Sequence, residues 1–403
     1  MSWQKEVANI KLQMKLSKRR WLAWTLGLLL LVSLSTLGGI IAYHYTPTHI
    51  TPCEVLGTDL CRIALLAPPA PPPPRPWLNK SDTEIAEFAL AVDLKHQSFR
   101  AQSGPSKVAF LFLTAGALPF ELLWERFFKG NEGLYSIYVH ASDTAINKKV
   151  VWKTDLFRSR MIRSQKVQWG NINMIDAERR LLTHAVLDQN NAYFVLLSDT
   201  CVPLHSFRYT YNHLLNFSGS FVDCFDDPGP HGRGRYMGYM SPQVEQWEWR
   251  KGAQWFAVQR HHALMVIADH VYYRKFKLFC KPGDNNRNCY PDEHYLQTFL
   301  FIMDSAGIAN WTVTHVDWSE GKWHPKSYTK ADVTAEKLRQ LQMIDEYVHK
   351  TSTAKAVVTR TPCIWNGERR PCFLFARKFL PETAQALLKI LPNSTWEKSP
   401  PLL

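Results

Sequence analysis

Asp292 and Glu293 are the acidic residues whose position best suits proton transfer. They lie at the start of the apolar segment 291–303, which predicts a helix with both acids in its first turn. Acids there also complement the helix dipole, and for an arbitrary helix that explanation is the commoner one. Two features favour chemistry here. The spacing of Cys280 and Cys289 predicts a disulfide-closed loop just before the acids, and a very apolar helix would hold its start at a packed position. A carboxylate that faces a cleft from such a place suits general-base catalysis.

A set of basic side chains near the C-terminus is the second candidate. Its members are Arg360, Arg369, Arg370, Arg377 and Lys378. The last two follow the apolar run FLFA, so we do not expect them on a fully solvated face. In an enzyme without a metal ion, such cations would neutralise a leaving diphosphate.

The motifs of several other chemistries are absent from the sequence. It has no G-x-S-x-G, no H-E-x-x-H, no Walker loop and no G-x-G-x-x-G after a strand. It also has no Asp-x-Asp, the pair with which many nucleotide-sugar enzymes hold a divalent cation. Asp226 and Asp227 come closest, but adjacent side chains point different ways and a Pro-Gly follows. We therefore predict no catalytic metal and no other cofactor.

The hydrophobic pattern predicts the α/β scaffold that must position these residues. Three continuous apolar runs are typical of strands buried on both faces, and they cover 108–114, 134–140 and 192–198. Helical spacing follows at 118–128, with Pro119 in the first turn, and at 176–188, with Asp176 as N-cap. Alternating strands and helices predict a parallel sheet with helices on its faces.

Beyond residue 220 the pattern predicts a long loop and several shorter elements. They are a loop at 225–240, an amphipathic helix ending the segment 252–270, a strand at 312–318, a helix near 333–349 and a C-terminal helix from Pro381.

An apolar segment at residues 21–43 predicts a membrane anchor. Its 23 residues include no charged residue and no histidine, and a helix of that length spans the ~30 Å hydrocarbon core. It is too long for the apolar part of a cleaved signal peptide. Residues 1–20 hold six basic residues and one acid, whereas no Lys or Arg follows the segment until Arg62. The positive-inside rule therefore predicts a cytosolic N-terminus and a lumenal remainder.

Cysteines and glycosylation sequons agree with a lumenal location. All eight cysteines follow the apolar segment. So do four sequons, at Asn79, Asn216, Asn310 and Asn393. Close spacing suggests the pairs Cys280–Cys289 and Cys363–Cys372, although eight cysteines allow 105 pairings and the sequence does not choose among them.

The net charge is +13, which suits solubility and also contact with an anion such as a diphosphate or an acidic glycan. Nucleic acid is not an expected partner in the lumen. The predicted organisation is a cytosolic tail at 1–20, a transmembrane signal-anchor at 21–43, a Pro-rich stem at 44–104 and a catalytic domain at 105–403.

A series of motifs then carries a family resemblance. In order they read VAFLFLT, YSIYVHAS, LLSDTCVPLHSF, FDDPGPHGRGRY, WRKGAQWF, YPDEHYL, VDWSEGKWHP and FLFARKF. Together they resemble the plant core-2/I-branching N-acetylglucosaminyltransferase-like proteins over about residues 105–390. The resemblance implies a GT-A-like, Rossmann-related fold and metal-independent, inverting transfer from a UDP-sugar.

The resemblance also implies roles for single residues. Glu293, in P-D-E, matches the catalytic base of the animal relatives. Arg360 and Lys378 match the residues that hold the diphosphate. Thr114 and His140, at strand ends, match the nucleoside site, although the animal relatives have Asp where this chain has His140.

One further stretch resembles the wall of the acceptor site. It contains Trp249, Arg250, Lys251, Gln254 and Trp255. A packed aromatic cluster is an equally good interpretation of it.

These expectations combine into a Golgi glycosyltransferase. By resemblance it transfers N-acetylglucosamine from UDP to a glycan or glycoprotein hydroxyl in a β linkage. Two alternatives are glucuronosyl transfer by the same fold and a non-catalytic, lectin-like lumenal protein. A glycosidase would need two facing carboxylates, and one good candidate stands out. The donor sugar, the acceptor, the disulfide map and the oligomeric state stay open.

Overall fold

A computed structural model describes residues 80–99, 104–142, 152–283 and 288–391 of the chain. The predicted tail and anchor, and most of the predicted stem, lie outside these ranges. Within them, no helix combines the length and the apolar character that crossing a bilayer requires.

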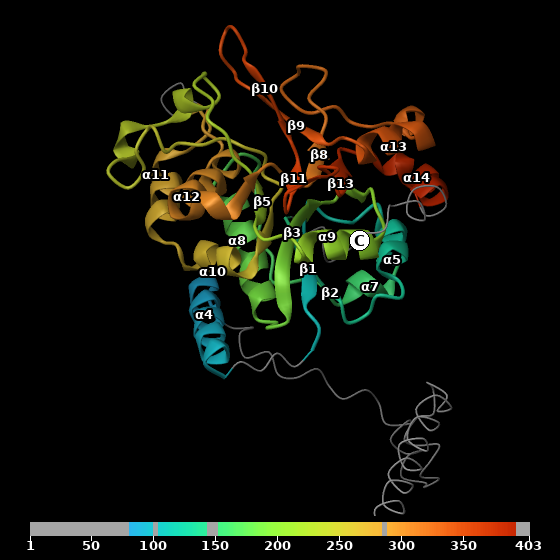
Figure 1. Cartoon of the computed structure of the whole chain (residues 1–403). Helices are drawn as coiled ribbons and strands as arrows, with labels where there is room; N and C mark the ends of the chain where they lie inside the picture. The colour runs from blue at the N-terminus through green and yellow to red at the C-terminus, as the bar shows by residue number, and fades with distance from the viewer. Residues whose placement is uncertain (1–79, 100–103, 143–151, 284–287, 392–403) are drawn as a thin grey trace, which may run out of the picture. The chain divides into compact units, whose positions relative to one another are not determined.

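A six-stranded sheet lies at the centre of the fold, in the order β2-β1-β3-β6-β5-β7 (Figure 1). Strands β2, β1 and β3 are parallel, β6 is antiparallel to β3 and β5, and β5 is parallel to β7. The strands are β1 (Lys107–Thr114), β2 (Tyr135–Ala141), β3 (Asn191–Ser198), β5 (Ser220–Asp223), β6 (Ala257–Gln259) and β7 (Ile308–Asn310). All three strands predicted from apolar runs are confirmed to within one residue.

Helices cover both faces of this sheet. The longer ones are α4 (Asp82–Phe99), α5 (Glu121–Phe128), α8 (Asn173–Val186), α9 (Phe207–Leu215), α10 (Arg260–Ala268), α11 (Val271–Phe279), α12 (Tyr295–Asp304), α13 (Ala335–Gln342) and α14 (Ala384–Ile390). A short helix, α7 (Asp155–Arg158), follows β2. The mixed α/β arrangement with a mostly parallel centre fits the predicted GT-A-like class.

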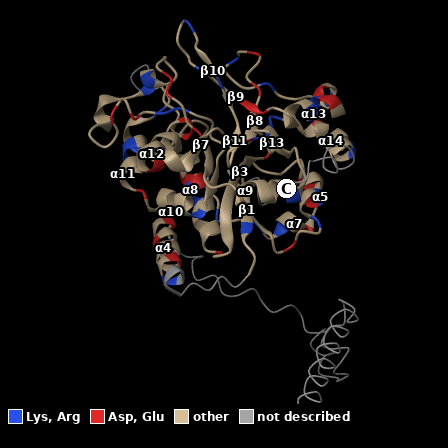
Figure 2. Ribbon diagram, in the orientation of Figure 1, with Lys and Arg blue, Asp and Glu red and all other residues tan. Residues whose placement is uncertain are grey.

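Strand β1 separates two hydrophobic cores, because successive side chains of a strand point to opposite faces. Phe110 and Phe112 pack with side chains of α5 and α9, whereas Leu111 and Leu113 pack with side chains of α8 and α10. Figure 2 shows the charged residues mainly on the outer helices and loops, around central strands that are mostly uncharged.

Three smaller sheets lie beyond the carboxyl ends of the central strands. One has the order β4-β13-β8, and the others are the hairpins β9–β10 and β11–β12. Their strands are β4 (Val202–Pro203), β8 (Thr314–Val316), β9 (Glu346–Lys350), β10 (Val358–Pro362), β11 (Ile364–Trp365), β12 (Glu368–Arg369) and β13 (Phe375–Arg377). The β9–β10 hairpin projects from the body of the fold in Figure 1.

Several predicted boundaries are corrected by the structure. The helix predicted near 333–349 ends at Gln342, and residues 346–350 form β9 because they pair with β10, a partner that local spacing does not reveal. Asp176 is not the N-cap of α8, since that helix begins at Asn173; its carboxylate instead accepts a hydrogen bond from Tyr273. Pro119 lies in the turn before α5.

Helix α4 comes from the segment predicted as stem, yet it packs on α8 and α10. Arg180 forms an ion pair with Asp82 at 2.5 Å, and Arg260 forms one with Asp93 at 2.7 Å. All described residues belong to one compact unit, so this part of the predicted stem is part of the folded body.

Candidate active site

The carboxyl ends of β1, β2 and β3 lie at one edge of the sheet, where open α/β folds bind ligands. Thr114 ends β1, and Asp199 directly follows β3. Burial raises the pKa of Asp199, and the nearby charges of Arg377 and Lys378 oppose that effect. An acid and two cations therefore meet at this edge.

Strand β13 ends at Arg377 and is followed by Lys378, so it brings both cations to this edge. The Arg377 guanidinium lies 4.2 Å from the ring centroid of Trp255, and its Nε is buried without a hydrogen-bond partner among the described residues. Burial lowers the pKa of Arg377. Both Arg377 and Lys378 are half-buried, as the preceding apolar run predicted. Because both side chains are partly buried, less water has to be removed from this basic pair when it binds an anion.

Glu293 occupies a short 3-10 turn, η3 (Pro291–Glu293), and not the first turn of α12. Its Oε2 accepts a hydrogen bond from Nη1 of Arg235 at 2.5 Å. The Glu293 side chain is 29% exposed, whereas that of Arg235 is 9% exposed. Arg235 is held in turn by the ring of Tyr290, 4.7 Å away, and by His294 Nε2 at 3.2 Å. The carboxylate is thus oriented by a buried cation and still reaches solvent.

Asp292 has a different environment from its neighbour. Its Oδ1 is buried without a hydrogen-bond partner among the described residues. Burial, followed by the charge of Glu293, raises the pKa of Asp292 to about 7. Burial also raises the pKa of Glu178, whose Oε1 accepts a hydrogen bond from Gln254 at 2.7 Å and which senses the charge of Asp292. Burial of the carboxyl group therefore raises the pKa of both Asp292 and Glu178.

A four-residue segment connects Glu293 to the basic pair. Gly252 N–H donates to the Glu293 carbonyl at 3.0 Å, and Trp255, three residues on, packs against Arg377. A side chain at Gly252 would collide with the carbonyl oxygen of Asp223, so this close path needs glycine. This segment therefore connects the backbone of Glu293 to the side chain that packs on Arg377.

The residues predicted for the acceptor wall divide into two groups. Trp249 is buried and stacks on Phe276 and His294, with ring centroids 5.2 and 4.7 Å away. Arg250 lies 3.5 Å from the ring centroid of Phe301. This packing favours the aromatic-cluster interpretation for Trp249 and Arg250.

The other group lies closer to Glu293 and the basic pair. It contains Lys251, Gln254 and Trp255. Burial lowers the pKa of Lys251 while the charge of Glu293 opposes that shift, so the two groups are near each other. Lys251 Nζ also lies 3.8 Å from Asp227 Oδ2. Gln254 contacts Glu178, as described above.

The adjacent acids Asp226 and Asp227 have separate partners. Asp226 pairs with Arg233 at 2.5 Å, whereas Asp227 accepts hydrogen bonds from both the backbone and the hydroxyl of Ser352. Their carboxylates do not converge on one point, in agreement with the sequence argument.

The two residues predicted for the nucleoside differ in position. Thr114 Oγ1 donates to the Gly116 carbonyl at the sheet edge. His140 is fully buried against α8, and its Nε2 accepts hydrogen bonds from Arg180 at 2.9 Å and from the Gln165 backbone at 3.2 Å. Its ring proton therefore lies on Nδ1. Burial, together with Arg180, lowers the pKa of His140 to about 4.

Arg360 lies on the exposed β10 strand, opposite Val348 of β9. Directly opposed residues share a face, and the next residue, His349, points to the other face and contacts Asp223 at 2.8 Å. Arg360 is thus on the outer face of the hairpin. Among the described residues, no hydrogen bond or ion pair joins it to Lys378.

Sequence reasoning missed three residues of this region. Asp199 could have been found from the sequence, because it directly follows a buried strand and ligands bind where such strands end. Glu178 is an acid among the buried residues of α8. Arg235 lies in the predicted loop at 225–240, where nothing in the spacing connects it to Glu293.

Two comparisons with known proteins bear on the family of this chain. Residues 108–342 match the family described as Branch: Core-2/I-Branching enzyme. The chain is also 37% identical to the rice (Oryza sativa subsp. japonica) protein "Glycosyltransferase BC10" over 319 residues, which is 72% of this chain and 77% of the rice protein. The matched family region contains Glu293, Arg235 and Asp199 and ends before Lys378. This chain belongs to the Core-2/I-branching enzyme family.

Proposed function

We propose that this protein is a glycosyltransferase that transfers a sugar from a UDP-sugar to a hydroxyl group of a glycan or glycoprotein, with inversion and without a metal ion. The observation that carries the proposal is the environment of Glu293. Its carboxylate is accessible, is oriented by Arg235, and lies one short chain segment from the half-buried cations Arg377 and Lys378. The family and the rice relative support the transferase class.

The proposed reaction is a single displacement. Glu293 takes the proton of the acceptor hydroxyl, and the hydroxyl oxygen attacks the anomeric carbon. The bond from that carbon to the diphosphate oxygen breaks on the opposite face, and UDP leaves with the electron pair. Arg377 and Lys378 stabilise the charge that grows on the diphosphate. Attack opposite the leaving group inverts the anomeric centre.

Arg235 gives Glu293 its orientation in this scheme. A charge-assisted hydrogen bond to one carboxylate oxygen holds that oxygen in place and leaves the other free for the acceptor hydroxyl. Since the Arg235 side chain is buried and held by Tyr290 and His294, it fixes the carboxylate with little loss of entropy during the reaction.

The finer assignments rest on the family resemblance. The proposed donor is UDP-N-acetylglucosamine with a β linkage, and UDP-glucuronic acid is the alternative donor. The proposed location is the Golgi membrane, with one N-terminal helix and a lumenal catalytic domain. Thr114 and His140 stay candidates for the nucleoside side, and Arg360 stays a candidate for the diphosphate.

A UDP-release assay over a panel of UDP-sugars tests this function. We expect turnover with one donor, and the Glu293→Gln variant should lose about 10²–10⁴-fold in kcat while binding UDP nearly as well as the wild type. Glu336→Gln, an exposed acid on α13, is the matched control and should keep full activity. Thermal melting should show that both variants fold.

Excess EDTA in the same assay tests the metal-independent chemistry. We expect turnover to persist, because the basic pair supplies the counter-charge. Loss of activity that Mn²⁺ restores would instead direct attention to Asp226 and Asp227. A folded Glu293→Gln variant with wild-type turnover would contradict the assigned base and make Asp292 the next residue to test.

A further inference from the structure

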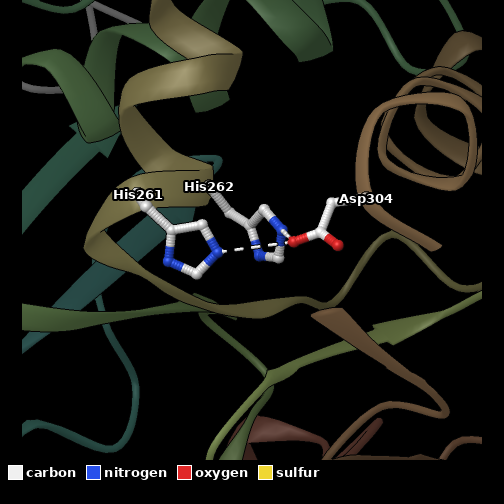
Figure 3. Close-up of side chains that lie close together, drawn as sticks. All are labelled: His261, His262 and Asp304. Atoms are coloured by element: carbon white, nitrogen blue, oxygen red, sulfur yellow. Dashed lines mark hydrogen bonds and ion pairs between the residues drawn. The ribbon is translucent and has the colours of Figure 1, made fainter. Parts of the chain in front are cut away.

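Two histidines and an aspartate converge where α10 begins and α12 ends (Figure 3). Asp304 Oδ2 lies 3.2 Å from His262 Nε2 and 3.8 Å from His261 Nε2, and the three potential ligand atoms all lie within 4.8 Å of one another. Zinc bonds of ~2.0–2.1 Å in a tetrahedron place ligand atoms ~3.3 Å apart. The separation between Asp304 and His262 already matches this value, and a small movement of the exposed His261 ring would bring the third ligand atom to it.

The supporting contacts orient these ligands. His262 Nδ1 lies 2.7 Å from Ser220 Oγ, and that oxygen accepts the Gln259 backbone N–H at 2.9 Å. Metal-binding histidines commonly have their second ring nitrogen held by such a partner. Asp304 Oδ1 accepts the Gly307 N–H at 3.0 Å, so Oδ2 is the oxygen turned toward both imidazoles.

The position of His262 suits a metal ligand. Its side chain is fully buried beneath His261 and Asp304. A neutral imidazole at this place can offer a lone pair to an ion. Binding needs only a change of tautomer, in which the ring proton moves to Nδ1 and is donated to Ser220 Oγ.

The ion would have a route in from solvent. The His261 side chain is 50% exposed and that of Asp304 is 37% exposed, whereas His262 is buried beneath them. Water can therefore fill the fourth position of a tetrahedral site. Two imidazoles and one carboxylate favour zinc over the oxygen-seeking ions magnesium and calcium.

This cluster is remote from the candidate active site. Gln259, next to the histidines, pairs with Tyr193 near the start of β3, whereas Asp199 follows the end of that strand. The six residue steps from Tyr193 to Asp199 span roughly 20 Å at ~3.3 Å per residue. An ion here would connect α10, α12 and, through Ser220, β5, and would not contact the donor or the acceptor.

We propose that His261, His262 and Asp304 form a Zn²⁺-binding site that links α10 and α12 at the amino edge of the sheet. It is independent of the proposed transferase chemistry, which needs no metal.

Calorimetric titration with ZnCl₂ tests the site, using the full chain purified without a polyhistidine tag and stripped with a chelator. We expect one ion per chain and a rise in Tm of a few degrees when zinc is in excess. His261→Ala and Asp304→Asn should each weaken zinc binding at least about tenfold, and Ser220→Ala about 10- to 100-fold. Asn at position 304 can still accept the Gly307 N–H, and His261 is exposed, so both variants should fold.

His270→Ala is the matched control, because His270 is an exposed histidine near the other end of α10. It should bind zinc like the wild type, and Co²⁺ bound to the wild type should give the visible absorption of tetrahedral coordination. UDP-sugar turnover well below Tm should be the same with and without zinc. Absence of zinc binding, or equal loss in the His270→Ala control, would overturn the site and leave the three residues as a hydrogen-bonded cluster.

Discussion

At the scale of single residues, Asp292 and Glu293 show how two neighbouring acids acquire different properties. The sequence left a helix-dipole explanation open for both. The structure separates them from α12 by His294, and the first turn of that helix contains no acid. Glu293 is accessible and paired with Arg235, whereas Asp292 Oδ1 is buried without a partner among the described residues. Glu293 therefore precedes α12 and is held by its ion pair with Arg235, which the dipole explanation does not account for.

Asp292 should make stability fall as the pH rises. Its pKa is raised from 3.8 to about 7, so between these values the folded state holds a proton that the unfolded state has lost. Stability therefore decreases from about pH 4 to pH 7 and levels off above. Asp292→Asn lacks that proton exchange, so the variant should gain up to ~4 kcal/mol over the wild type at pH 7.5 and little at pH 4.

Urea denaturation at the two pH values measures this difference. Asp155→Asn, which replaces an exposed aspartate, should track the wild type at both. An Asp292→Asn variant that is no more stable than the wild type at pH 7.5 would show that the carboxylate is solvated or paired in the folded protein.

Lys378 and Arg360 should contribute unequally to UDP binding. Lys378 is half-buried beside Asp199, so Lys378→Ala should cost ~1.5–3 kcal/mol, or about 10- to 100-fold in affinity. Arg360 is exposed on the outer face of its hairpin, so Arg360→Ala should cost less than ~1 kcal/mol. Calorimetry with UDP measures both, with exposed Arg339→Ala as the control. Equal losses for the two variants would mean that the β9–β10 hairpin closes over the diphosphate.

At the scale of elements, two disulfides close loops of the same length, but only one of these loops adjoins the candidate active site. The structure confirms both pairs that spacing suggested, Cys280–Cys289 and Cys363–Cys372, each with a sequence separation of nine. Closing a loop of that size restricts the unfolded chain by ~2.5 kcal/mol, so replacing either pair by alanines should cost about that much stability.

Only the first pair should also affect catalysis. Its loop ends at Cys289, next to Tyr290, whose ring supports Arg235 and through it Glu293. We expect the Cys280→Ala/Cys289→Ala variant to lower kcat, and the Cys363→Ala/Cys372→Ala variant, with its equal loop, to keep kcat at a temperature where both are folded. The assay is UDP release beside guanidinium denaturation. Equal kcat in the two variants would show that the Cys280–Cys289 loop does not position Glu293.

At the scale of the whole molecule, the proposed topology makes two exposed sequons testable. Asn216, at the end of α9, and Asn310, at the end of β7, are both exposed, so a transferase in the lumen could glycosylate them. Endoglycosidase should lower the apparent mass of the wild type. Replacing both residues by Gln should reduce that shift.

Protease added to sealed microsomes gives the complementary measurement. The catalytic domain should stay intact until detergent opens the vesicles. Digestion without detergent would contradict the orientation that the flanking charges predict.

The apolar pattern by itself determined much of this fold. Continuous runs located β1, β2 and β3 to within one residue, because a strand covered on both faces must be apolar along its length. Close spacing suggested both disulfides, because a loop with eight residues between its cysteines costs little chain entropy to close. The motifs also indicated the family. These signals are local, so they can be interpreted without knowing which distant residues are in contact.

The tertiary structure decided which side chains meet. Arg235 and Glu293 are 58 residues apart, and the proximity of Asp199 to Lys378 depends on β13 reaching the edge of the central sheet. The strand identity of 346–350 depended on pairing with β10, and Trp249 became a core residue once Phe276 and His294 packed on it. No local pattern encodes such contacts, because they arise from packing between elements far apart in the chain. For the same reason, the convergence of His261, His262 and Asp304 was visible only after folding.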